Sequence, residues 1–209
     1  RPNDSPSMPN GGPDKLLVKD GVTIKSSTGG DIELLARGDF TLEAKAHVET
    51  TGDVTIRGDH LTDGIVGTTI DLLGTIRADR VAVRGNAGND TVNVTNVLSL
   101  AETTVSAGAG NDIVNVATQT PASEAGETVN RIAALLTING DANSDTLNVD
   151  DSGDTAANTG SLTSTAITGV FATGGSINYG TLETLNINLG SAGDTFTIRS
   201  THAGSTTLN

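Results

Sequence analysis

One short motif recurs through the second half of this chain. Residues 85–94 read Gly-Asn-Ala-Gly-Asn-Asp-Thr-Val-Asn-Val, with close copies at 108–116 and 140–149 and a shortened copy at 190–198. Their aspartates are separated by 22, 33 and 49 residues. These intervals suit one coil of a parallel β-helix, one coil with an insertion, and two coils with a loop. Repetition of one supersecondary unit predicts a stacked repeat architecture.

The remaining composition favours the same architecture. Only 2% of the 209 residues are aromatic, whereas a compact globule needs bulky side chains to fill a wide interior. The first half contains short apolar alternations typical of half-buried strands, for example at 22–24, 31–34, 40–42, 53–56, 70–72 and 80–83. We therefore predict an all-β fold, a right-handed parallel β-helix (β-solenoid) that forms a single elongated domain.

Three segments are expected along this domain. Residues 1–14 hold four of the five prolines and have no hydrophobic period, which predicts a linker or an arm that docks on a neighbouring subunit. Residues 15–84 form a first set of coils. Residues 85–209 form acidic coils rich in Gly, Asp and Asn. The stretch 124–138 is the best helix candidate, but its mixed composition favours a loop that leads into a strand at 135–138.

Charge and cysteine content restrict the partners. The net charge is −13, of which about −10 falls after residue 84, so nucleic acid and anionic membrane surfaces are expected to be repelled. No apolar run approaches the roughly 20 residues of a membrane span. Cysteine is absent, so a secreted chain would need a staple other than a disulfide. In an acidic repeat protein, that staple is expected to be calcium.

In-register stacking makes a prediction about side-chain columns. Val94, Val116 and Val149 are expected in one interior column. Asn93, Asn115 and Asn148 are expected above one another, with their amides hydrogen-bonded along the stack. The register, and hence whether the Asn column faces inward or outward, stays open at this point.

Two families resemble parts of the chain. The stretches 30–34 and 52–58 resemble the β-helical repeats of filamentous haemagglutinin-type adhesins. Gly85, Gly88, Asp90 and Val92 match the first, fourth, sixth and eighth positions of G-G-x-G-x-D-x-U-x, the calcium-binding nonapeptide of repeats-in-toxin proteins. That family repeats its motif every nine residues, whereas here the copies are a coil or more apart. The resemblance therefore implies calcium-binding turns without the tandem ladder.

Ligand chemistry points to the same turns. Calcium prefers six to eight oxygens from carboxylates, Asn side chains and backbone carbonyls, and glycine lets a turn curl so that its carbonyls converge. The predicted ligands are Asn86, Asn89, Asp90, Asn111, Asp112, Asp141, Asn143, Asp145 and Asp194. Alternatively, these Asn and Asp side chains only cap turns through hydrogen bonds to backbone. The acidic group Asp150, Asp151 and Asp154 is expected to be a solvated loop.

The functional expectation is a structural or adhesive module, an adhesin-like rod at the cell surface or outside the cell that is not an enzyme. Its partners would be further copies, stacked head-to-tail into a filament, or other surface-matrix components. The alternative is a calcium-dependent polysaccharide-binding or lyase β-helix, in which Arg77, Arg80 or Arg84 near Asp79 supplies the base. The simpler interpretation of these arginines is surface pairing with neighbouring acids.

Overall fold

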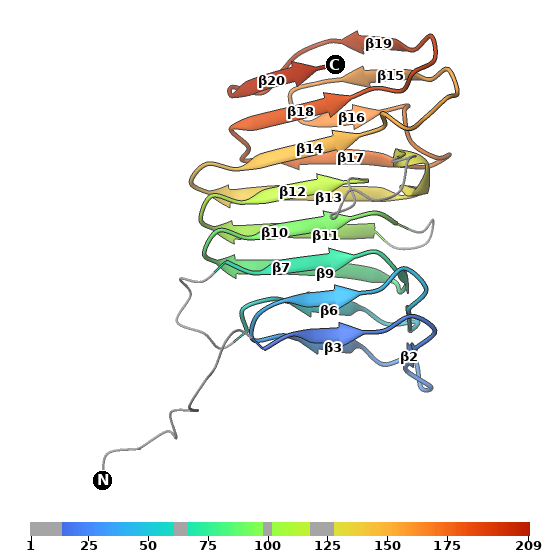
Figure 1. Cartoon of the computed structure of the whole chain (residues 1–209), viewed down its shortest axis with the longest axis vertical. Coiled ribbons are helices and arrows are strands. Elements are labelled where there is room, and N and C mark those ends of the chain that lie inside the picture. The colour runs from blue at the N-terminus through green and yellow to red at the C-terminus, as the bar shows by residue number, and fades with distance from the viewer. Residues whose placement is uncertain (1–13, 61–66, 98–101, 118–127) are drawn as a thin grey trace.

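The computed structural model describes residues 14–60, 67–97, 102–117 and 128–209, and over these ranges the chain is all-β. Within them, the one helical element is a short 3₁₀ turn, η1 (Val129–Arg131). The strands stack from the N-terminal end to the C-terminal end (Figure 1). Most of the expected arm, residues 1–13, lies outside the described residues, as does most of the insertion expected near 119–130.

The described strands form three sheets. The eight-stranded sheet contains, in spatial order, β1 (Leu16–Val18), β4 (Phe40–Leu42), β7 (Thr69–Leu72), β10 (Thr91–Val94), β12 (Ile113–Val116), β14 (Thr146–Asp150), β18 (Thr184–Asn188) and β20 (Ser205–Leu208). The nine-stranded sheet contains β19 (Thr195–Ile198), β15 (Thr159–Leu162), β16 (Ala166–Thr168), β17 (Ser176–Gly180), β13 (Leu135–Ala142), β11 (Glu102–Ala109), β9 (Arg80–Ala87), β6 (Val54–Arg57) and β3 (Ile32–Leu35). The three-stranded sheet contains β2 (Thr23–Lys25), β5 (His47–Glu49) and β8 (Thr75–Arg77).

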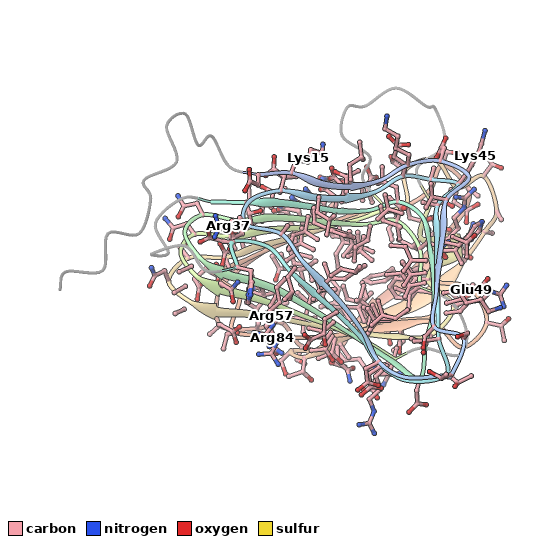
Figure 2. The ribbon with its side chains drawn as sticks, turned by 90° about the horizontal axis from the view of Figure 1, so that it is seen from below. Lys15, Arg37, Lys45, Glu49, Arg57 and Arg84 are labelled. Atoms are coloured by element: carbon pink, nitrogen blue, oxygen red, sulfur yellow. The ribbon has the colours of Figure 1, made fainter. Side chains whose placement is uncertain are left out.

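Successive strands belong to different sheets for most of the chain. From β1 to β9 the chain visits the eight-, three- and nine-stranded sheets in turn, and from β10 to β15 it alternates between the two larger ones. From β1 to β14, each return places a strand parallel to the previous strand of the same sheet, for example Phe40 beside Leu16 and Ile113 beside Thr91. Side chains from facing strands fill the interior, while Lys15, Lys45 and Glu49 lie at the periphery (Figure 2). The expected short strands in the first half are confirmed to within one or two residues at their starts.

The first three motif copies stack in register, as the spacing predicts. Thr91 of β10 pairs with Ile113 of β12, which in turn pairs with Thr146 of β14. Buried Val94, Val116 and Val149 therefore form one interior column, at 0%, 0% and 1% exposure. Strand β13 begins at Leu135, so the expected strand at 135–138 is also confirmed.

The expected place of the fourth copy is wrong. The strand that pairs with β14 is β18, whereas β19, which contains the end of the fourth copy, pairs with β15 in the nine-stranded sheet. The physical reason is the antiparallel run β15–β16–β17, which occupies the intervening chain and breaks the parallel pattern. Glu183, not Asp194, follows Asp145 in the stack, since its Oε2 accepts the Asp145 N–H at 2.7 Å.

The predicted asparagine column exists and lies on the face of the eight-stranded sheet opposite the valine column, because Asn148 alternates with the buried Leu147 and Val149. The Asn115 amide donates to Asn93 Oδ1 at 2.8 Å, and Asn148 donates to Asn115 Oδ1 at 2.8 Å. The column continues beyond the prediction, because Asn186 donates to Asn148 at 2.9 Å and Asn93 donates to Asp71 at 2.7 Å. Asn93 is 1% exposed, so these bonds replace those that buried amides would lose to water.

Replacing one rung of this column should be costly. Asn115→Ala removes a donor and an acceptor at once, so buried Asn93 Oδ1 and the half-buried Asn148 amide each lose this hydrogen bond. The free energy of unfolding should fall by about 1–3 kcal/mol. Urea denaturation would measure it, with Asn178→Ala as the matched control because Asn178 is an exposed strand residue. An equal loss in both variants would show that the column adds nothing beyond strand propensity.

Candidate functional site

The three turns that lead into β10, β12 and β14 lie one above another. Asn86, Gly108 and Asp141 are aligned by the pairing of β9, β11 and β13. All three have positive φ, at 91°, 118° and 73°. A second aligned set two residues further on, Gly88, Gly110 and Asn143, also has positive φ, at 100°, 146° and 87°.

This backbone geometry accounts for the residue types in the motif. Gly, Asn and Asp are the residues that tolerate the left-handed region at least cost. At Gly108 a side chain is excluded for a second reason, since a Cβ there would overlap the Asn86 carbonyl oxygen of the preceding turn. The alternation of Gly with Asn or Asp at these positions therefore has a conformational cause that is independent of any ligand.

The motif aspartates point inward and form a ladder along the stack. Asp112 Oδ1 accepts the backbone N–H of Asp90 at 2.7 Å, and Asp145 Oδ1 accepts that of Asp112 at 2.9 Å. The ladder begins with Thr68, whose N–H donates to Asp90 Oδ1 at 2.6 Å, and it ends at Glu183. Each carboxylate thus caps the backbone of the preceding turn, not that of its own turn.

The second oxygen of each of these carboxylates is buried without a hydrogen-bond partner. Asp90, Asp112 and Asp145 are only 1%, 1% and 2% exposed, and the Oδ2 atom of each makes no hydrogen bond. A Cβ built on Gly85 would overlap Asp90 Oδ2, and one on Gly140 would overlap Asp145 Oδ2. The glycine five residues before the aspartate therefore provides the space that the inward carboxyl group occupies.

Burial raises the pKa values of these carboxyl groups. The pKa of Asp90 rises to about 7 through desolvation, which outweighs its hydrogen bond from Thr68, and the charges of Asp112 and Asp59 add to the rise. Desolvation likewise raises the pKa of Asp145 to about 6, helped by nearby Asp112, Glu183 and Asp141. The pKa of Asp112 is raised for the same reason, with Asp141 nearby. An ionised ladder is therefore electrostatically costly near neutral pH unless a proton or cation neutralises it.

The other predicted ligands of these turns lie on the outside. Asn86, Asn89, Asn111, Asp141 and Asn143 are all exposed. Asn89 Oδ1 accepts the Asn111 N–H at 2.9 Å, and Asn111 Oδ1 accepts the Ser144 N–H at 3.1 Å, so these two amides also cap backbone. Asp141, Asn143 and Asp145 do not converge on one point, because Asp145 is buried and the other two are exposed.

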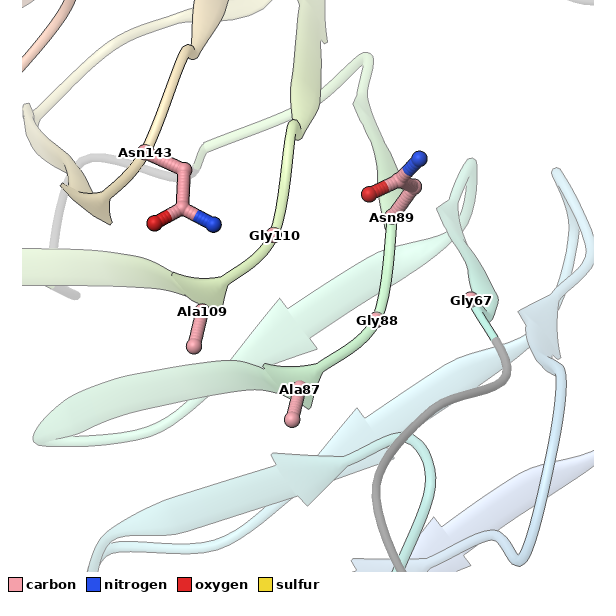
Figure 3. Close-up of a pocket in the computed structure, with 7 residues that line it drawn as sticks. All are labelled: Gly67, Ala87, Gly88, Asn89, Ala109, Gly110 and Asn143. Carbon is pink, nitrogen blue, oxygen red and sulfur yellow. The ribbon is translucent and has the colours of Figure 1, made fainter.

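A shallow, open hollow of about 430 Å³ lies on the outer side of the turns. It is lined by small residues of neighbouring turns, including Gly88 and Gly110, with the amides of Asn89 and Asn143 beside them (Figure 3). The hollow therefore offers amide and backbone oxygens but none of the three inward carboxylates.

Asp194 belongs to a separate acidic region. Its Oδ1 accepts the Asn158 N–H at 2.8 Å, away from the three stacked turns. The neighbouring Asp151 and Asp154 are 2% and 6% exposed, so the expectation of a solvated loop is wrong for both. Asp154 accepts the Ala156 N–H and the amides of Asn130 and Asn158, which lower its pKa, whereas burial raises the pKa of Asp151 to about 6.

The three arginines considered as a catalytic base lie in two different sheets. Arg77 lies in β8 of the three-stranded sheet, whereas Arg80 and Arg84 lie in β9 of the nine-stranded sheet. All three are exposed, and the described residues contain no ion pair to any of them, so the expected surface pairing is wrong within those ranges.

Searches of the described ranges and of known proteins add little to this geometry. Within the described residues, no group of three or more His, Cys, Asp and Glu side chains converges as for a metal ion, and no helix is long and apolar enough to cross a membrane. Comparisons with protein-family models, curated proteins and solved structures found no match. The class of protein therefore has to be inferred from the fold and the stacked turns.

Two participants in the ladder were not predicted from the sequence. Glu183 stands outside any motif copy, so nothing in the repeat marked it. The small residue that leaves room for each carboxyl group could have been found from the sequence, because Gly85, Ala107 and Gly140 each stand five residues before a motif aspartate.

Filling the space beside one carboxyl group should destabilise the fold. Gly85→Ala should lower the free energy of unfolding by about 1–3 kcal/mol through overpacking against Asp90 and the Ala107 carbonyl. Gly193→Ala is the matched control, since a Cβ there meets no atom within 4 Å. In an Asp90→Ala background the same substitution should cost less. An undiminished cost there would mean that the glycine does not serve the aspartate.

Stability should depend on pH through the ladder. The folded-state pKa values of Asp90 and Asp145, about 7 and 6, lie above the ordinary 3.8, so the folded state retains protons that the unfolded state releases. In the presence of a chelator, the melting temperature should be highest near pH 4 and fall as pH rises through 7. Asp90→Asn should flatten this fall. A melting temperature that rises over the same interval would contradict the shifts.

Proposed function

We propose that the chain is a right-handed parallel β-solenoid, a single elongated rod that works as a structural or adhesive module at the cell surface or outside the cell. The observation that carries the proposal is the unbroken axial ladder from Thr68 through Asp90, Asp112 and Asp145 to Glu183. A rod is the shape that such repetition builds, because each turn contacts only its neighbours and length grows by adding turns.

The ladders suit a load-bearing module. Asparagine amides run along the outer face of the eight-stranded sheet, and carboxylates connect successive turns at its edge. Both sets of bonds run along the stack, so pulling or bending the rod acts on them directly.

Self-association is part of the proposal. Within the described residues, the two larger sheets end in strands with an unpaired edge, β1 and β3 on one side and β20 and β19 on the other. Unpaired edges invite pairing with another chain. Leu35 on β3 and Ile198 on β19 are 39% and 51% exposed, so apolar surface would be buried as well. The partner would be a second copy, stacked head-to-tail, or another surface-matrix component.

Calcium would serve as the neutralising cation. The residues fit it in one respect, since three neighbouring carboxylates each have a buried oxygen that no hydrogen bond satisfies. Asp90, Asp112 and Asp145 would supply these oxygens, while Asn86, Asn89, Asn111, Asp141 and Asn143 supply further oxygens on the outer side of the same turns. A bound divalent cation would offset the repulsion between the stacked charges.

The alternative function is a polysaccharide lyase or binding module. The exposed Arg80 and Arg84 on one strand favour it, since a cationic face suits an acidic sugar. Incubation with polygalacturonate, with absorbance of the unsaturated product as the readout, separates the two classes. Product formation would replace the structural proposal with the lyase.

Calcium should raise thermal stability. Saturation to about 100 times the dissociation constant contributes about 2.7 kcal/mol, which corresponds to a rise of roughly 5–10 °C for a chain of this size. The Asp90→Asn/Asp112→Asn/Asp145→Asn variant should lose the rise, whereas Asp194→Asn should keep most of it. Magnesium is the control ion. An unchanged melting temperature in millimolar calcium would remove calcium from the proposal.

End-to-end assembly should also depend on calcium. Electron microscopy should show end-to-end rods in calcium and shorter particles after chelation. Rods that persist in chelator would separate assembly from calcium, and monodisperse single particles under both conditions would contradict self-association.

A further inference from the structure

We infer that the outer face of β6 and β9 binds a linear acidic polysaccharide through a row of unpaired arginines beside a shallow hollow. The inference names a class of ligand for the adhesive function proposed above. It rests on that proposal only for its biological setting. The row and the hollow both lie on neighbouring strands of the nine-stranded sheet.

The arginine row consists of Arg57 and Arg84, with Arg37 near the end of the neighbouring β3. Arg57 and Arg84 are aligned partners in parallel strands, so their backbones are about 4.8 Å apart. The side chains of Arg57 and Arg84 lie together on one face of the molecule (Figure 2). Like charges directly opposite each other on neighbouring strands destabilise a sheet. The fold therefore maintains an arrangement that is unfavourable without a counter-charge.

No carboxylate provides that counter-charge in the described ranges. The one ion pair there joins Lys25 and Glu49 in the three-stranded sheet, at 3.2 Å. Arg57 Nε is buried and makes no hydrogen bond, so an external ligand would contact the terminal Nη atoms of this side chain. Guanidinium groups bind carboxylate or sulfate oxygens through two parallel hydrogen bonds, which is the contact that this row leaves open.

The hollow lies on the same strands, two residues before the arginines. It measures about 340 Å³ and is lined by Thr55, Ala82 and Thr104 on three neighbouring strands, with Asp53, Arg80 and Glu102 at the strand starts. Ala82 pairs with both threonines, so its short side chain produces a dip between them. The threonine hydroxyls in this hollow can donate hydrogen bonds to sugar hydroxyls or accept hydrogen bonds from them, and the carboxylates can accept such bonds.

This combination selects a polysaccharide over other polyanions. The carboxylates of Asp53 and Glu102 would accept hydrogen bonds from the hydroxyl groups that every sugar ring of a polysaccharide presents. The net charge of −13 would repel any acidic polymer, so binding depends on the local arginine row. Base stacking also lacks a platform there, because none of the residues that line the hollow is aromatic. Charge recognition by arginine replaces the aromatic stacking used by neutral-sugar sites.

Binding of full-length protein to polygalacturonate, dextran sulfate and neutral dextran would test the inference, with affinities measured by calorimetry at two salt concentrations. The two acidic polymers distinguish carboxylate from sulfate ligands. At least one of them should bind, more weakly at the higher salt concentration, and dextran should not. Arg57→Gln/Arg84→Gln should weaken binding at least about tenfold, because two charge-assisted contacts are lost. Arg131→Gln/Arg199→Gln, which removes the same net charge elsewhere, should change affinity less than about twofold.

A second variant leaves the charge unchanged. Ala82→Leu fills the dip between Thr55 and Thr104 and should also weaken binding, and circular dichroism would verify that each variant folds. The inference is overturned if neither acidic polymer binds, if dextran binds equally, or if both arginine pairs lose affinity to the same extent. Equal binding of double-stranded DNA through the same arginines would overturn the polysaccharide assignment. None of these outcomes bears on calcium binding or head-to-tail assembly, so the two proposals fail separately.

Discussion

Axial hydrogen bonding between equivalent side chains is the interaction on which the rest of the structure depends. A strand in this fold has its main-chain groups paired with the strands before and after it, but main-chain pairing alone tolerates a slip of register. The side-chain columns do not. Asn115 bonds to Asn93 and Asn148 only if each stands directly above the next, and a shift would leave buried amides unsatisfied. Register, interior packing and the alignment of the turns all follow from this requirement.

The carboxylate ladder applies the same rule at the turns, with an electrostatic cost that amides do not have. Asp112 and its neighbours stabilise the preceding turn through one oxygen and leave the other buried and unsatisfied. Each carboxyl group reaches the N–H of the neighbouring turn because a small residue, Gly85, Ala107 or Gly140, stands five residues before it. The ladder thus couples the cohesion of the stacked turns to protons or cations in its surroundings. In the described ranges, the outer face of β6 and β9 carries the opposite imbalance, since Arg57 and Arg84 lie side by side without an ion pair.

Much of the fold was predictable because its determinants are local or periodic. The alternation of apolar residues marked the short strands, and the 22- and 33-residue intervals aligned the first three copies correctly. The predicted position of the fourth copy was wrong although its sequence resembles the motif. The chain before it forms the antiparallel strands β15, β16 and β17, which the repeat intervals do not predict. Asp151 and Asp154 were misjudged for a related reason. Acidic residues in a loop are usually solvated, and only the approach of η1 and Asn158 buries these two.

The sequence by itself determined the strand class, the alignment of the asparagine column and the need for glycine, asparagine or aspartate in the turns, because side-chain period and backbone conformation are properties of neighbouring residues. Only the tertiary structure decided which way each polar side chain faces, the asparagine column included. Asp145 and Asp141 are four residues apart in one motif, yet one caps a buried N–H and the other is exposed, because the direction of a turn residue depends on the turn stacked against it. The in-register stacking of Arg57 on Arg84 is likewise invisible along the chain, since 27 residues separate them and only strand pairing brings them together.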